Sequence, residues 1–143
     1  MIIFIFLTYN YMEELLKRQL NIITNKLSYK DIVRIYNFLD PKSTIFGKEC
    51  CLWKGYVTNT NSIKTSPYIN FYYKRKKVML HRLLYMNYVG SINDDEFLKL
   101  TCKNKGYCCN INHMEKHAYK RKEKKIKLIK NNNDNISDII IIF

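Results

Sequence analysis

The sequence has 143 residues, of which 47% are hydrophobic, and its 25 Lys and Arg residues outnumber 12 Asp and Glu residues to give a formal net charge of +13. This hydrophobic content excludes a wholly disordered basic tail, and the length predicts a single domain (residues 1–143) with one modest core. So large a positive charge opposes compaction by self-repulsion, which indicates an anionic partner, either nucleic acid or an anionic membrane surface.

The first segment, residues 1–11, opens with the apolar run Met1 to Leu7, which is too short to span a bilayer. It has no basic lead-in and no small-residue cleavage site, so we expect an edge strand or a floppy terminus, with no secretion signal and no membrane anchor. Five cysteines, an odd number, argue against a secreted disulfide framework. We therefore expect an intracellular, reducing compartment.

Two amphipathic helices are predicted in the helical region, residues 12–41. The first, Met12 to Lys26, carries apolar residues on one stripe. The second begins after Ser28, because Ser28 and Asp31 have the spacing of a capping box. Asp40 and Pro41 end it.

A β-hairpin and a third helix are predicted farther along the chain. Residues 41–66 lack periodicity and indicate a loop that carries Trp53. The β-prone stretch from Pro67, a cationic turn and Val78 to Leu80 then predict a hairpin with a basic tip, which could enter a major groove. The cationic residues are Lys74, Arg75, Lys76 and Lys77. Residues 81–89 have helical spacing and are stopped by Gly90.

A cluster of metal-ligand residues follows in the segment from Cys102 to His113. Two cysteines and a histidine fall in this short knuckle, with Cys108 and Cys109 as alternatives for the second thiolate. Cys50 or Cys51 supplies a further thiolate from upstream. A structural zinc site takes four thiolate or imidazole donors in a tetrahedron, so the sequence predicts a zinc ion that joins the two ends of this region.

The chain after His113 predicts a basic helix that reaches Lys130, then a low-complexity linker and an apolar run, Ile139 to Phe143. The helix would lie along a phosphate backbone. The apolar run is too short to span a membrane. It would either pair as a strand, with residues 2–7 as a candidate partner, or, if unpaired, form an aggregation or interaction segment. The basic helix end, linker and tail make up residues 123–143.

Several of these motifs resemble the zinc-binding HNH endonuclease-like proteins of the His-Me finger superfamily, which include the His-Cys box homing endonucleases. The segment Cys50 to Gly55 is similar to their Cys-Trp-x-Trp-x-Gly opening, and residues 68–92 are similar to their hairpin and His-Arg helix. Cys108 to Glu115 matches their Cys-Val-Asn-Pro-x-His-Leu-Glu, with Ile111 in place of proline. The resemblance covers residues 50–122, about half of the chain.

The resemblance implies an α+β fold in which a small zinc-stapled ββα unit follows the N-terminal helices and precedes a basic C-terminal helix. It implies Zn²⁺ as a structural cofactor held by Cys50, Cys102, Cys108 and His113. The knuckle has one residue more than the common family spacing, so Cys109 remains an alternative ligand. Homing endonucleases dimerise, so a homodimer is among the assemblies that the resemblance allows.

The catalytic positions of the family are altered in this chain. Leu100 stands where the family has its general base, and Lys122 stands where the family has its divalent-metal ligand. A leucine cannot accept a proton, and an ammonium group repels Mg²⁺ and attracts phosphate. The resemblance therefore favours a non-catalytic protein, as in the DNA-binding domains of Smad proteins, which belong to the same superfamily.

From these observations we expect a non-enzymatic nucleic-acid-binding protein, with double-stranded DNA as the favoured partner. The expected phosphate contacts are the four hairpin cations together with Lys120, Arg121, Lys122, Lys124 and Lys125.

Two other functions are compatible with the sequence. One is a divergent nuclease in which His81 or His117 replaces the missing base, although a core or capping role competes for His81. The other is a protein-interaction module for acidic partners. Richness in Asn, Lys and Ile is typical of an AT-rich genome, and with the resemblance it suggests a viral or mobile-element origin. A viral particle or factory therefore joins the nucleus and cytoplasm as an expected location.

Overall fold

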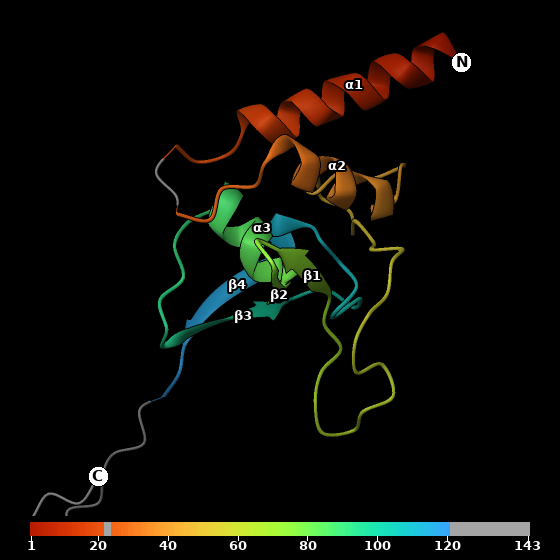
Figure 1. Cartoon of the computed structure of the whole chain (residues 1–143). Helices are drawn as coiled ribbons and strands as arrows, with labels where there is room; N and C mark the ends of the chain where they lie inside the picture. The colour runs from red at the N-terminus through yellow and green to blue at the C-terminus, as the bar shows by residue number, and fades with distance from the viewer. Residues whose placement is uncertain (22–23, 121–143) are drawn as a thin grey trace, which may run out of the picture.

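The computed structural model describes residues 1–21 and 24–120, and its fold is α+β, as the sequence predicts (Figure 1). Two helices, α1 (Ile2–Lys17) and α2 (Tyr29–Phe38), come first. The strands β1 (Asn70–Tyr73) and β2 (Lys76–Met79) form one antiparallel pair and lead into α3 (Leu80–Tyr88). A second antiparallel pair, β3 (Glu96–Leu100) and β4 (Met114–Ala118), encloses the short 3-10 helix η1 (Ile111–His113).

Helix α1 differs from the sequence prediction at both ends. It includes residues 2–11, which we expected as a strand or a floppy terminus, and it ends at Lys17 rather than Lys26. Neither glycine nor proline separates the apolar run from the amphipathic stripe, and extending a helix is easier than nucleating a separate element. The stripe residue Ile23 lies outside the described residues. Because residues 2–7 are helical, the prediction that they form a strand paired with residues 139–143 is wrong.

The first turns of α1 project beyond the rest of the protein (Figure 1), and their apolar side chains are largely exposed, including Phe4 at 62% and Phe6 at 65%. Leu15, near the other end, is buried in the core. Only the second half of α1 therefore contributes to packing. Within the described part of the chain, no helix combines the length and the apolar character needed to cross a bilayer.

Helix α2 begins as predicted, with a complete capping box. The backbone N–H of Asp31 donates to Ser28 Oγ at 3.2 Å, and the Ser28 N–H donates to the Asp31 carboxylate at 3.1 Å. Leu27 and Ile32 on either side of this box are both buried. The helix ends at Phe38, close to the predicted stop.

The predicted hairpin is confirmed, with Tyr73 opposite Lys76 and a two-residue turn between them. Alternation along β1 buries Tyr73 and leaves Tyr72 57% exposed. Helix α3 follows β2 directly, and Val89 caps its C-terminal end. The hairpin turn is exposed to solvent. At the opposite end of the hairpin, β2 continues directly into α3, which buries one face in the core.

Strand β4 corrects the prediction of a helix immediately after His113. Residues Met114 to Ala118 pair with β3 from Leu100 to Glu96. Once the loop between β3 and β4 turns the chain back beside β3, a strand satisfies the backbone groups of β3 that a helix would leave unpaired. The rest of the expected basic helix, from Arg121 onward, lies outside the described residues.

One hydrophobic cluster joins the helices to the hairpin and to the loops that carry the cysteines. Trp53 belongs to this cluster, and its backbone N–H donates to the Tyr107 carbonyl at 2.8 Å. Its ring packs on Phe38 with 5.2 Å between centroids. Gly55 is needed there, because a Cβ atom at this position would lie 2.6 Å from Trp53 Nε1. These contacts anchor the long loop, residues 41–66, just after Cys50.

Candidate metal centre

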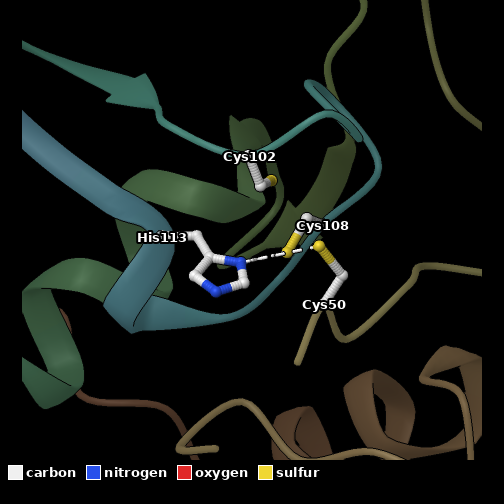
Figure 2. Close-up of side chains that lie close together, drawn as sticks. All are labelled: Cys50, Cys102, Cys108 and His113. Atoms are coloured by element: carbon white, nitrogen blue, oxygen red, sulfur yellow. Dashed lines mark hydrogen bonds between the residues drawn. The ribbon is translucent and has the colours of Figure 1, made fainter. Parts of the chain in front are cut away.

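Four side chains that the sequence singled out converge in space. Cys50 comes from the long loop before β1, Cys102 and Cys108 from the knuckle between β3 and β4, and His113 from η1 (Figure 2). Their ligand atoms all lie within 4.8 Å of one another. Residues separated by up to 63 positions are therefore brought to a single point.

Two distances within this cluster match those of a tetrahedral metal site. His113 Nδ1 lies 3.6 Å from Cys50 Sγ and 3.5 Å from Cys108 Sγ. A tetrahedral zinc with bonds of about 2.3 Å to sulfur and about 2.0–2.1 Å to nitrogen places neighbouring donors about 3.5–3.8 Å apart. The cluster is thus compatible with a metal site. Three thiolates and one imidazole are a donor set that suits zinc.

The imidazole of His113 is held in the orientation that a metal ligand needs. Its Nε2 atom donates to the Lys48 carbonyl at 2.8 Å. This bond assigns the proton to Nε2 and leaves the lone pair of Nδ1 directed at the sulfur atoms. The same bond ties η1 to the segment that precedes Cys50.

The Cys108 thiol is the most buried donor of the cluster. Burial raises the pKa of this thiol to about 12, although the Asn110 N–H, 3.4 Å from the sulfur, favours the thiolate. Without a cation the group stays protonated at neutral pH. A bound metal ion supplies the positive charge that makes a buried thiolate favourable, so metal binding would release a proton here.

Two asparagines that the sequence analysis did not single out connect the cluster to the long loop. Asn110 is fully buried, and its side-chain amide donates to the carbonyls of Gly47 and Glu49 at 2.9 and 2.6 Å. Asn112 donates to Phe46 and Gly47, each at 3.0 Å. These bonds fix the approach to Cys50. The Asn-x-Asn spacing directly before His113 is the sequence signal that could have revealed them.

The alternative ligands Cys51 and Cys109 do not belong to the cluster. Both are fully buried, and the Cys109 N–H donates to the Cys51 carbonyl at 2.7 Å. Burial raises the pKa of both thiols. All five cysteines are free thiols, and these two serve as small apolar residues of the core.

The candidate base His81 lies on the buried face of α3 and is only 5% exposed. Its Nε2 atom donates to the Cys108 carbonyl at 2.8 Å, and burial lowers its pKa, so the ring is neutral at neutral pH. This geometry agrees with the core role that competed with catalysis. His117 is exposed on β4, where it contacts Glu115 at 3.3 Å.

Comparison with known proteins finds a relative of this chain but no matching family model. No family model matches the sequence, and neither does any solved structure. An uncharacterized protein of Acanthamoeba polyphaga mimivirus is 43% identical over 136 residues, which cover 91% of this chain and 39% of that protein. The chain therefore spans about two fifths of the length of the relative that it matches. The resemblance to HNH proteins stays a prediction.

The expected phosphate contacts fall in two places. Lys74 and Arg75 form the hairpin turn, Lys76 and Lys77 begin β2, and all four side chains are exposed. Lys120 is exposed just after β4. The remaining members of the basic set lie outside the described residues: Arg121, Lys122, Lys124 and Lys125.

Proposed function

We propose that this protein binds a structural Zn²⁺ ion through Cys50, Cys102, Cys108 and His113 and uses the stapled scaffold to bind double-stranded DNA without cleaving it. The single observation that carries the proposal is the convergence of these four donors within 4.8 Å. Zinc is the favoured ion because structural sites of this composition are typically tetrahedral zinc sites.

The likeness to HNH proteins supports this proposal through the order of the elements. The hairpin, the helix that begins Leu80-His81-Arg82 and the loop with Cys102 and Cys108 occur in the order that the sequence motifs predicted, whereas the strands β3 and β4 that enclose this loop were not predicted. This likeness concerns the architecture of the site, and a shared architecture alone does not establish a function.

The charge distribution supports a polyanionic partner. The turn of the β1–β2 hairpin exposes four successive cations, and none of them is in an ion pair with a described residue. Lys74 and Arg75 have positive φ angles of 45° and 63°, a backbone region that costs about 1–2 kcal/mol per residue for side chains other than glycine. Strain at a cationic tip indicates that these residues serve binding rather than stability.

Two observations support the absence of nuclease activity. Leu100, at the position of the family base, is half-buried and pairs with Met114. His81 is buried, and its Nε2 proton is committed to a carbonyl group. Leucine has no atom that accepts a proton, and His81, which is 5% exposed, offers only its Nδ1 atom as an acceptor.

A fluorescence anisotropy titration with duplex DNA over a series of salt concentrations tests the proposal. We expect affinity to fall steeply with salt, with a slope of about 0.9 for each phosphate contacted. Lys74→Ala and Arg75→Ala should each weaken binding to all sequences and reduce the slope by about one unit. Lys64→Ala, which removes an exposed cation in the loop before β1, is the matched control.

Two outcomes would contradict the proposal. Absence of duplex binding at low salt would favour a protein-interaction module for acidic partners. Nicking of supercoiled plasmid in the presence of Mg²⁺ or Mn²⁺, if abolished by His117→Ala or His81→Ala, would make the protein a nuclease with a substitute base.

A further inference from the structure

A second site is formed by a cavity of about 480 Å³ on the side of the protein where the knuckle meets the hairpin. Its walls come from the loop before β1, the first turn of α3, strands β3 and β4, and the knuckle. The lining includes three aromatic side chains, Tyr68, Phe97 and Tyr119. It also includes three cationic side chains, Arg82, Lys99 and Lys105. We call this cavity the knuckle pocket.

The electrostatics of the knuckle pocket favour an anionic ligand. No acidic side chain lines it, and Arg82, Lys99 and Lys105 form no ion pair with any described residue. Arg82 donates through Nη1 to the Glu96 carbonyl at 3.3 Å, and this bond holds the guanidinium at the wall of the pocket. Its other N–H groups have no hydrogen-bond partner among the described residues. A guanidinium group with two ammonium groups is suited to a phosphate.

Two of the aromatic side chains that line the pocket, Phe97 and Tyr119, pack against each other. The rings of Phe97 and Tyr119 lie 4.8 Å apart, and Phe97 also stacks on His117 with 5.6 Å between ring centroids. Tyr119 is 59% exposed. An exposed aromatic face next to cations is the arrangement on which nucleic-acid bases stack, because every base has a flat π-face.

The wall opposite β3 depends on the knuckle. Gly106 has a φ angle of +84°, and a Cβ atom there would lie 2.4 Å from the Pro67 carbonyl oxygen. Glycine therefore allows the knuckle turn to pack directly on the loop before β1, and the neighbouring Lys105 is carried to the pocket with it. The turn lies between Cys102 and Cys108, so a metal ion bound by the cluster would fix both ends of this wall.

We infer that the knuckle pocket binds one nucleotide, with its base against Tyr119 and Phe97 and its phosphate at Arg82, Lys99 and Lys105. The volume lies within the range of about 300–1,000 Å³ that is usual for small-molecule sites. A base inside an intact duplex cannot expose its face to this surface. The ligand is therefore an unpaired nucleotide, either within a DNA strand or free. As part of DNA recognition, the inference rests on the proposed function.

The test compares a fully paired duplex, the same duplex with one bulged nucleotide, and the same bulge without its base. We expect the bulged duplex to bind about 5- to 100-fold more tightly than the paired one, since stacking of one base on an aromatic side chain has an effect of this size. Removing the base should abolish the preference. A second arm titrates a free deoxynucleoside monophosphate, and binding there would indicate that the free nucleotide is also a source of the ligand.

Variants separate stacking from general charge. Tyr119→Ala should remove the preference for the bulge, and Tyr119→Phe should keep it. Tyr29→Ala, an exposed tyrosine on α2, is the control for loss of an aromatic ring. Lys105→Ala should weaken bulge binding more than Lys103→Ala, because Lys103 lies on the same knuckle but does not line the pocket.

The outcomes distinguish the inference from the proposed function. Binding of the paired duplex with no preference for the bulge, together with no Tyr119-dependent binding of the mononucleotide, would overturn the nucleotide pocket and leave DNA binding intact. Failure to bind any duplex would overturn the proposed function. In that case, mononucleotide binding that is lost in Tyr119→Ala would still support the pocket, and its absence would overturn both.

Discussion

Asn110 connects the two halves of the metal cluster at the scale of single residues. Its amide holds the carbonyls of Gly47 and Glu49, which precede Cys50, while its backbone N–H donates to Cys108 Sγ. Removing a group that orients a metal ligand in this way typically lowers the metal affinity 10- to 100-fold, which corresponds to about 1.4–2.7 kcal/mol of binding free energy.

We therefore expect Asn110→Ala to weaken zinc binding by about 10- to 100-fold, measured by competition with a chromophoric chelator. Asn61→Ala is the matched control, because Asn61 is exposed in the long loop and lies outside the cluster. Equal zinc affinity in the two variants would show that the segment before Cys50 is positioned by other contacts.

Asn87 has a purely structural role on α3. It is fully buried, and all of its side-chain hydrogen-bonding groups are used. Its Oδ1 accepts from Gln19 Nε2 and the Leu27 N–H, while its Nδ2 donates to the carbonyls of Asn25 and Leu83. The side chain thus joins α3 to the connection between α1 and α2.

Asn87→Ala should lower the free energy of unfolding by about 2–4 kcal/mol, because it leaves several buried polar groups without a partner. Urea unfolding in the presence of zinc measures this. Asn93→Ala, at an exposed position in the loop after α3, should change stability by less than about 0.5 kcal/mol. A loss in Asn87→Ala no larger than in this control would mean that water replaces the lost bonds.

At the scale of elements, the hairpin turn shows a conflict between stability and charge. Both central residues of the turn, Lys74 and Arg75, have positive φ angles, for which Asn-Gly is the preferred pair. The double variant Lys74→Asn, Arg75→Gly should raise the free energy of unfolding by about 1 kcal/mol and weaken duplex binding. Urea unfolding and anisotropy titrations measure the two effects.

The control for this prediction removes the same charge elsewhere on the hairpin. Lys76→Ala with Lys77→Ala removes two cations from strand residues whose φ angles are not positive, and it should not stabilise the fold. If the turn variant were no more stable than the wild type, the left-handed conformation of Lys74 and Arg75 would carry no strain.

The elements differ in how well the sequence predicts them, for physical reasons. Helix α2 and the β1–β2 hairpin carry local signals, a capping box and a cationic turn between β-prone runs, and both are confirmed. Strand β4 carries no such signal, because of its five residues only Met114 is buried and its partner β3 is brought close by the loop between them. The apolar start of α1 contains no periodic pattern at all.

The candidate site shows the same division. Cys102 and His113 follow from the spacing of the knuckle, the resemblance to HNH proteins implies Cys50 and Cys108 as the other two ligands, and the structure brings all four together. The choice of Cys108 over Cys109 depends on which neighbour faces the core, which spacing alone does not determine. The hydrogen bonds of Asn110 connect segments more than 60 residues apart, and only the folded chain reveals them.

At the scale of the whole molecule, the cluster joins a long loop to a knuckle in a chain with a net charge of +13. A structural zinc ion contributes about 10–16 kcal/mol of apparent binding free energy, which equals or exceeds the total stability of an ordinary small domain. Removal of the metal by a chelator should therefore unfold at least the region that holds the cluster, and added zinc should restore it. Circular dichroism and amide hydrogen exchange measure the change.

A pair of cysteine variants provides the control for metal removal. Cys102→Ser should lose the bound metal and behave as the chelated protein does. Cys109→Ala should keep it, because Cys109 is a core residue outside the cluster. Chelation that left hydrogen exchange around the knuckle unchanged would show that the fold holds this region without a metal ion.

X-ray absorption at the zinc edge, combined with the metal content of the purified protein, tests the central claim most directly. The account predicts one tightly bound zinc per chain, with three sulfur neighbours at about 2.3 Å and one nitrogen neighbour at about 2.0–2.1 Å. A protein that folds without zinc, or a zinc ion surrounded only by oxygen and nitrogen atoms, would contradict it.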